Sequence, residues 1–191
     1  KQGINPHVAL NKLYKKTRLQ TTFGIIMLAL VDGEPEVLTM KEMLTHYIDH
    51  QKEVVTRRTQ YKLDKAEARA HILEGFQVAL DNIDRVIKIV RGSENSKSAQ
   101  KKLIAEFELS KKQAKAILDM RLHRLTGLEQ EKINQEYKEL EAEIKEYKSI
   151  LGSEEKLLTT IKDELQELKN KYNDERRSEI RDEDINLKLE D

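Results

Sequence analysis

Two histidines near residue 50 have the spacing of metal ligands. His46 and His50 stand four residues apart and Glu53 follows three positions later, so a helix would bring the three side chains to nearly one face. Imidazole and carboxylate groups arranged in this way can hold a zinc ion. The neighbouring Gln51 and Lys52 instead indicate a solvated helix surface, and no further ligand motif accompanies the histidines. We therefore predict no metal site.

The chain offers few groups for covalent or acid–base catalysis. It has no cysteine, which excludes thiolate nucleophiles, disulfides and zinc sites of the cysteine type. Its 7 glycines are scattered and form no phosphate-binding loop. The carboxylates of residues 139–145 alternate with lysine and apolar residues, in the manner of a charged helix surface. We expect no catalytic residue and no cofactor in this chain.

The basic side chains are the feature of this sequence that best suits the binding of a partner, namely a polyanion. Residues 1–127 hold 23 Lys/Arg and 15 Asp/Glu, whereas residues 128–191 hold 12 and 20, although the whole chain is neutral. Contacts of such side chains with DNA phosphates would be sequence-independent and sensitive to salt. Solubility alone is the alternative explanation. The candidate DNA-facing residues are Arg57, Arg58, Lys62, Lys65 and Arg69, and a second basic group consists of Lys101, Lys102, Lys111, Lys112 and Lys115.

The overall composition favours long exposed helices. Charged residues make up 37% of the 191 residues and aromatics 5%, a profile unlike that of a compact, sheet-rich enzyme. No run of 18 apolar residues is present, so we expect no contact with a membrane. The first residues lack the apolar stretch of a signal peptide, which makes the cytoplasm the expected compartment. Because the sequence opens without Met, we expect it to be a piece of a larger protein.

Residues 1–38 are expected to be the end of a domain that begins earlier. Asn5 and Pro6 suit the N-cap and the first position of a short helix. Apolar runs on both sides of Asp32 and Gly33 predict a β-hairpin. A segment of fewer than about 40 residues rarely builds a core without outside help.

Residues 39–92 predict the first of two long helices. Thr39 and Glu42 form a capping box at its start, and Gly92 suits the position after its last turn. One continuous helix of this length would span about 80 Å. An apolar heptad pattern runs through its last third, at Leu73, Phe76, Leu80, Ile83, Ile87 and Val90.

Residues 93–127 predict a small helical globule. A short helix over residues 98–107 is followed by a capping box at Ser110 and Gln113, which begins a helix that reaches residue 125. Apolar residues cover most of its circumference, so one partner surface cannot bury them all. We therefore expect a homodimer with a two-fold interface at this globule. The candidate interface residues are Ala114, Ile117, Leu118, Met120, Arg121, Leu122, Arg124 and Leu125.

Residues 128–173 predict a second long helix that returns along the first. It begins at a third capping box, Thr126 with Glu129, and carries one heptad register with a bend at Gly152. Residues 174–191 predict an acidic linker or tail. The expected fold is mainly α, with a long antiparallel coiled-coil hairpin, a small helical dimerisation globule at its tip, and a short β-hairpin near the N-terminus.

Several stretches of the sequence closely resemble the A subunits of bacterial type IIA topoisomerases. They follow the family's order across residues 5–180, and matches of this length are specific. The gyrase branch is the closer resemblance, and the topoisomerase IV branch is second. The matching stretches are residues 13–17 (LYKKT), 19–21 (LQT), 65–75 (KAEARAHILEG), 113–122 (QAKAILDMRL), 124–129 (RLTGLE) and 174–180 (DERRSEI).

The resemblance implies a role for each part of the chain. Residues 1–38 would be the end of the tower domain, and residues 39–92 and 128–173 would be the outgoing and returning coiled-coil helices. Residues 93–127 would form the C-gate, the dimerising exit gate for DNA. Residues 174–191 would be the acidic linker.

The resemblance also implies what the whole enzyme does. Such enzymes cleave one DNA duplex with an active-site tyrosine, pass a second duplex through the break and release it through the C-gate. ATP and Mg are used on a partner subunit of the gyrase B type. No tyrosine of this sequence matches the active-site motif, so we expect this chain alone neither to cleave DNA nor to hydrolyse ATP. Its expected place is the nucleoid in the cytoplasm.

Two other functions are open from the residues alone. A generic coiled-coil spacer or partner-binding arm would associate along the heptad seam, independently of residues 114–125. A monomeric nucleic-acid-binding arm would use the basic stretch 57–69 and bind duplex DNA in a salt-sensitive way.

Overall fold

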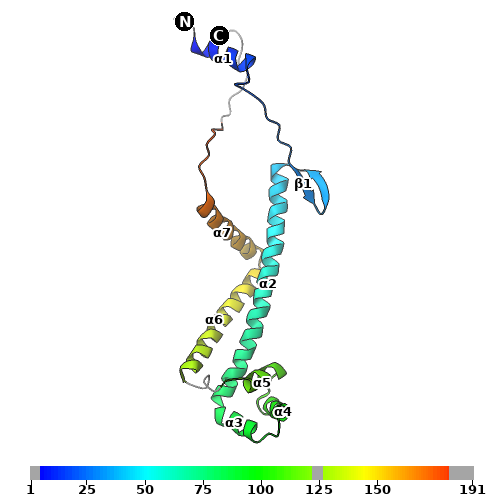
Figure 1. Ribbon diagram of the computed structural model, residues 1–191, viewed down its shortest axis with the longest axis vertical. Helices are drawn as coiled ribbons and strands as arrows, with labels where there is room; N and C mark the ends of the chain where they lie inside the picture. The colour runs from blue at the N-terminus through cyan, green and yellow to red at the C-terminus, as the bar shows by residue number, and fades with distance from the viewer. Residues whose placement is uncertain (1–4, 122–126, 181–191) are drawn as a thin grey trace. The chain divides into compact units, whose positions relative to one another are not determined.

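The computed structural model describes residues 5–121 and 127–180, and Figure 1 labels their helices and strands. The chain divides into two compact units, one of residues 1–48 with 168–191 and the other of residues 49–167. The described residues are mainly helical, with one β-hairpin near the N-terminus, so the predicted fold class is confirmed. None of the described helices is both long and apolar enough to cross a membrane.

The first unit contains a capped helix and a tight hairpin. Helix α1 (Pro6–Lys16) begins after Asn5, whose side chain accepts a hydrogen bond from the backbone N–H of His7 at 3.0 Å. Strands β1 (Leu28–Val31) and β2 (Glu34–Val37) pair antiparallel around Asp32 and Gly33. Both turn residues have positive φ, 51° and 90°, as a two-residue hairpin turn of type I′ requires. The predicted cap and hairpin are confirmed.

Helix α2 (Met40–Asp81) begins where the capping box predicts. The backbone N–H of Thr39 donates to the Glu42 carboxylate at 2.7 Å, and the N–H of Glu42 donates to Thr39 Oγ1 at 3.4 Å. Two orphan amides at the helix start are thereby satisfied by side chains of the same turn. The Glu42 carboxylate has a lowered pKa because it accepts the Thr39 backbone hydrogen bond.

The continuous helix predicted up to residue 91 is wrong. Helix α2 ends at Asp81, and a separate helix α3 (Ile83–Arg91) begins after Asn82. Asn82 donates from Nδ2 to the carbonyl oxygen of Val78 at 3.0 Å. Such a local side-chain bond offers the backbone an alternative to the helical ladder. The break also lets Val86 enter the core at 5% exposure.

The globule after α3 contains two further helices. Helix α4 (Ser96–Phe107) is capped by Asn95, and α5 (Lys111–Leu118) by a complete capping box at Ser110. The helix predicted up to residue 125 ends seven residues early, at Leu118. Its last turn is closed by the bond from the N–H of Met120 to the carbonyl of Ile117 at 3.2 Å. This three-residue spacing is typical of a helix that tightens as it ends.

The returning segment consists of α6 (Gly127–Leu151) and α7 (Glu154–Tyr172). The bend or frayed turn expected at Gly152 corresponds to a break in the helix, because α6 ends at Leu151 and α7 begins at Glu154. The predicted heptad seam is only partly buried. Ile133 and Ile161 are 5% and 4% exposed, whereas Leu158 is 40% exposed.

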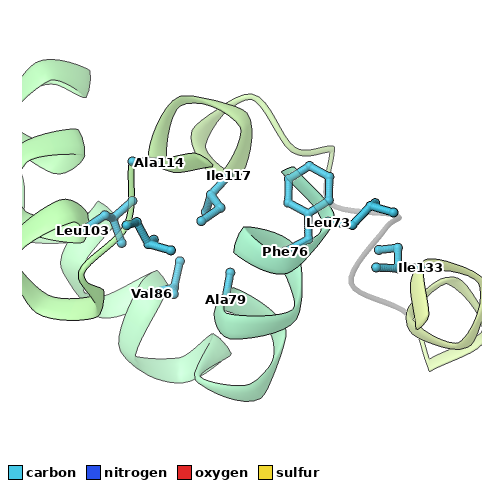
Figure 2. Packing of buried hydrophobic residues seen from close by; sticks show 9 residues of the cluster. Leu73, Phe76, Ala79, Val86, Leu103, Ala114, Ile117 and Ile133 are labelled. Atoms are coloured by element: carbon cyan, nitrogen blue, oxygen red, sulfur yellow. The ribbon is translucent and has the colours of Figure 1, made fainter. Parts of the chain in front are cut away.

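The hydrophobic core of the second unit joins α2, α3, α4, α5 and α6 (Figure 2). Leu73 of α2 and Leu103 of α4 have no exposed surface. The globule therefore packs on the end of the helical arm. The buried cluster consists of Leu73, Phe76, Ala79, Val86, Leu103, Leu109, Ala114, Ile117 and Ile133.

Candidate functional site

An apolar cleft of about 510 Å³ lies where the end of α2 meets α3 and α5. Helix α3 supplies half of its lining, and Ile87 and Val90 remain 41% and 40% exposed on it. Aliphatic groups concentrated around an open apolar hollow are typical of a protein interaction surface. The lining residues are Ala79, Leu80, Ile83, Val86, Ile87, Val90, Arg91, Ile117, Leu118 and Met120.

The break at Asn82 is what creates this cleft. A heptad seam assigns Ile83, Ile87 and Val90 to contacts along the arm, but α3 is a separate helix and presents them to the cleft. The sequence prediction therefore missed the contribution of α3. A usable signal was present, because Asn82 lies inside the predicted helix and Asn has low helix propensity.

The structure separates the predicted interface residues into three groups. Ala114 has no exposed surface, and Ile117, which also lines the cleft, is 7% exposed, so the chain's own core covers most of both side chains. Leu118 and Met120 are half-buried and line the cleft, while Arg121 is exposed and does not line it. The other three, Leu122, Arg124 and Leu125, lie outside the described residues.

Ion pairs connect the outgoing helix to the returning helices of the second unit. Lys52 Nζ lies 2.9 Å from the Glu154 carboxylate, and Lys148 Nζ lies 2.7 Å from that of Glu67. Arg69 binds Glu136 with two hydrogen bonds of 2.7 and 2.8 Å. These bonds raise the pKa of the Arg69 guanidinium. A bidentate arginine–carboxylate pair of this kind fixes the relative orientation of the two side chains in addition to pairing their charges.

The same ion pairs decide which candidate DNA-facing residues are available. Arg58 is bonded to Glu164, and Arg69 is held by Glu136. Arg57 contacts Glu53 on its own helix at 3.6 Å. Lys62 and Lys65 are exposed, and in residues 5–121 and 127–180 neither takes part in an ion pair. Among the five candidate DNA-facing residues, these two lysines are therefore the most available to bind an anion.

The remaining candidates from the sequence, the two histidines and the second basic group, are exposed. His46 and His50 are exposed, and the described part of the chain contains no group of three or more His, Asp or Glu side chains that could hold a metal. In the second basic group, Lys102 donates to the carbonyl oxygen of Gly92 at 3.2 Å. Lys101 and Lys111 are exposed on α4 and α5.

A second, polar cleft of about 600 Å³ lies between α2 and α6. The Tyr137 hydroxyl there donates to the Glu74 carboxylate at 3.2 Å. Loss of solvation and the nearby Glu74 raise the pKa of Tyr137 to about 12, because a phenolate would have to form beside a carboxylate. The lining residues are Glu67, Ala70, His71, Glu74, Tyr137, Glu141, Ile144, Lys145 and Lys148.

This shift predicts a loss of stability in strong alkali. The folded pKa of about 12 exceeds the ordinary value of 10.0, so the neutral phenol stabilises the fold fully below pH 10 and loses this effect as the pH rises towards 12. Tyr137→Phe should remove the tyrosinate absorbance that develops near pH 12, followed together with helical circular dichroism. An absorbance titration that is unchanged in the variant would contradict this assignment.

Comparison with known proteins places the chain in a family. Residues 1–166 match the family of the A subunits of DNA gyrase and topoisomerase IV. The chain is 55% identical to the DNA gyrase A subunit of Clostridium acetobutylicum over 191 residues, which is 100% of this chain and 23% of the relative. It is 57% identical over 180 residues to the DNA gyrase A subunit of Halalkalibacterium halodurans, covering 94% of the chain and 22% of the relative.

A third relative gives the same result. The DNA gyrase A subunit of Staphylococcus aureus strain Mu50 is 54% identical over 180 residues, covering 94% of the chain and 20% of the relative. The chain thus spans between a fifth and a quarter of the length of these relatives. With a family match that extends over most of its residues, the chain belongs to the A subunits of DNA gyrase and topoisomerase IV.

Proposed function

We propose that this chain is the coiled-coil arm and C-gate of a type IIA topoisomerase, from the A subunit of the gyrase branch. Two chains would meet at the globule formed by α3, α4 and α5. In the whole enzyme this contact would open to release the transported duplex during an ATP-dependent change of DNA topology. The gyrase branch is preferred over topoisomerase IV because the three relatives described above are named as the A subunits of DNA gyrases.

The apolar cleft is the observation that carries this proposal. Its wall from α3 keeps Ile87 and Val90 about two-fifths exposed, and burying such groups against a second copy removes apolar surface from water. A two-fold contact uses the same patch on both chains. The cleft also includes Arg91, so the contact combines apolar surface with a cation, which suits an interface that must open.

The arm serves as a spacer in this proposal. The four cross-helix ion pairs at Lys52, Arg58, Arg69 and Lys148 connect α2 with α6 and α7. Surface pairs contribute little individually, but together they specify which faces of the helices meet. Cleavage of DNA, hydrolysis of ATP with Mg, and the gyrase B-type partner would belong to other parts of the enzyme, acting on the nucleoid in the cytoplasm.

The solution mass of the chain tests the proposal directly. We expect a dimer, at twice the chain mass of 22.3 kDa, in size exclusion with light scattering. A spacer or partner-binding arm that associates along the seam would also be dimeric, but its mass would not respond to changes in the cleft. A chain that stays monomeric at high micromolar concentration would contradict the proposed gate.

We also propose that Lys62 and Lys65 contact the transported duplex. Replacing both with glutamine should weaken binding of a short duplex and reduce the slope of log K against log salt by about 1 to 2, because each phosphate contact contributes roughly 0.9 to that slope. Fluorescence anisotropy across a salt series measures both quantities. The matched control replaces Lys156 and Lys162, two exposed lysines of α7, and should leave the slope unchanged. Duplex binding that is insensitive to salt would exclude this contact.

A further inference from the structure

One buried glutamine connects α5 to α2. Gln113 is 7% exposed, and its Oε1 accepts the backbone N–H of Ser110 at 2.9 Å, which completes the capping box of α5. Its Nε2 donates to the backbone carbonyl of His71 on α2 at 2.7 Å and lies 3.4 Å from His71 Nδ1. The oxygen of this side chain thus serves its own helix, and the nitrogen serves the neighbouring one.

The His71 ring makes a second connection between the same helices. Its Nε2 lies 2.7 Å from Ser110 Oγ, which also accepts the backbone N–H of Gln113 at 3.2 Å. Because Gln113 Nε2 is a donor that lies 3.4 Å from His71 Nδ1, this contact requires the ring proton on Nε2, where it is donated to Ser110 Oγ. The Glu74 carboxylate, 3.7 Å from His71 Nδ1, lies beyond hydrogen-bond distance. This tautomer is assigned from the network of hydrogen bonds.

Gly75 permits the close approach that these bonds require. It is buried one turn after His71 on α2. A Cβ placed on Gly75 would lie 2.7 Å from Gln113 Cβ and 2.8 Å from Gln113 Cγ, distances that atoms of this kind do not tolerate. A glycine inside a helix is otherwise destabilising relative to alanine, and the approach of α5 gives a physical reason for it here.

These four residues lie next to both walls of the apolar cleft. Ala79 and Leu80 follow Gly75 by four and five residues on α2, and Ile117 and Leu118 follow Gln113 by the same numbers on α5. One helical turn rises about 5.4 Å, so a shift at the connection is transmitted to the walls with little room for relaxation in a close-packed core.

We propose that Gln113, His71, Ser110 and Gly75 form a joint that sets the distance between the two walls of the cleft and so sets the affinity of the dimer. This inference rests on the proposed function of the cleft. The four are positioning residues, since none of them lines the cleft. The joint explains how residues that never touch the partner chain control the interface.

The substitution Gln113→Glu separates the two roles of this side chain. A carboxylate still accepts the N–H of Ser110, so α5 remains capped, but it cannot donate to the carbonyl of His71. We expect an increase of about tenfold or more in the dimer dissociation constant, measured by sedimentation equilibrium on the whole chain, with unchanged helical circular dichroism. Gln100→Glu is the matched control, because Gln100 Nε2 also donates to a carbonyl, that of Lys111 at 3.0 Å, but from a half-buried residue rather than a buried one. Its effect should stay below about twofold.

A pair of small substitutions tests the close approach independently. Gly75→Ala should weaken the dimer in the native background, where the new Cβ meets Gln113. The same change should have no further effect in a Gln113→Gly background, where the opposing Cβ is missing. An effect that does not arise from the contact with Gln113 would instead be equal in the two backgrounds. Urea unfolding of the same variants separates a loss of stability from a loss of dimer affinity. This comparison decides the question even where Gln113→Glu fails to fold.

The ring of His71 supplies a readout that does not depend on association. Nitrogen-15 NMR of the native chain should show His71 with its proton on Nε2, and Gln113→Glu should change its Nδ1 signal. A proton on Nδ1 in the native chain, or a native dimer that Gln113→Glu and Gly75→Ala both leave unchanged, would overturn the joint alone. A native chain that never dimerises overturns the proposed function first, and this inference with it.

Discussion

Replacing Ile87 with glutamate is expected to convert the dimer into a monomer. Ile87 is 41% exposed and lines the apolar cleft on α3, so the single chain folds without burying the new carboxylate. In the dimer that carboxylate would be buried against aliphatic groups with no partner, which is strongly unfavourable. We expect the dissociation constant to rise by about a hundredfold or more, on the order of 3 kcal/mol. Light scattering across a dilution series measures it.

The neighbouring residue provides the control for this substitution. Lys88 is exposed on the same helix and does not line the cleft, and Lys88→Glu changes the charge by more than Ile87→Glu does. Its dimer should nevertheless persist. Leu118→Glu, on the α5 wall, should act in the same direction as Ile87→Glu. Persistence of the dimer in both cleft variants would mean that the chains meet elsewhere, as a seam-paired arm would.

Replacing Leu103 with alanine is expected to produce the largest loss of folding stability. Leu103 has no exposed surface and belongs to the core that joins α4 to α2, α3 and α5. Removing its side chain loses transfer free energy and leaves a cavity that the rigid surroundings fill only partly. We expect a decrease of about 2–5 kcal/mol in the free energy of unfolding. Urea unfolding followed by circular dichroism, at one fixed protein concentration, measures it.

A leucine of the returning helix gives the comparison. Leu158 occupies the predicted heptad seam but is 40% exposed in α7. Its replacement by alanine should cost less than about 1 kcal/mol, because little apolar surface returns to water. Equal losses in the two variants would show that the seam around Leu158 is as well packed as the core around Leu103.

The features that were predicted correctly from the sequence are local. The capping boxes at Thr39 and Ser110, the N-cap Asn5 and the hairpin turn at Asp32 and Gly33 all join groups within four residues. In each case the donor, the acceptor and the backbone geometry are contained in one short segment. The family resemblance, carried by long contiguous stretches, was equally readable and is confirmed by the family match.

The candidate site was only partly predictable. Of the apolar residues predicted as an interface in the 114–125 segment, Leu118 and Met120 line the cleft of the globule. An apolar residue suits a core and an interface equally well, so the sequence could not show that Ala114 is buried by its own chain. It also could not assign Ile87 and Val90 to the cleft, because that depends on the direction α3 takes after Asn82.

The charged residues show most clearly the difference between what the sequence predicts and what only the tertiary structure decides. The basic stretch from Arg57 to Arg69 was visible at once, but the partner of Arg58 lies 106 residues away and that of Arg69 lies 67 residues away. The return of α6 and α7 along α2 pairs Arg58 and Arg69 with carboxylates, whereas Lys62 and Lys65 remain exposed. Helix caps, turns and family membership follow from neighbouring residues, because their interactions have short range along the chain. Burial, helix ends and ion-pair partners depend on packing between distant segments, which the order of residues alone does not specify.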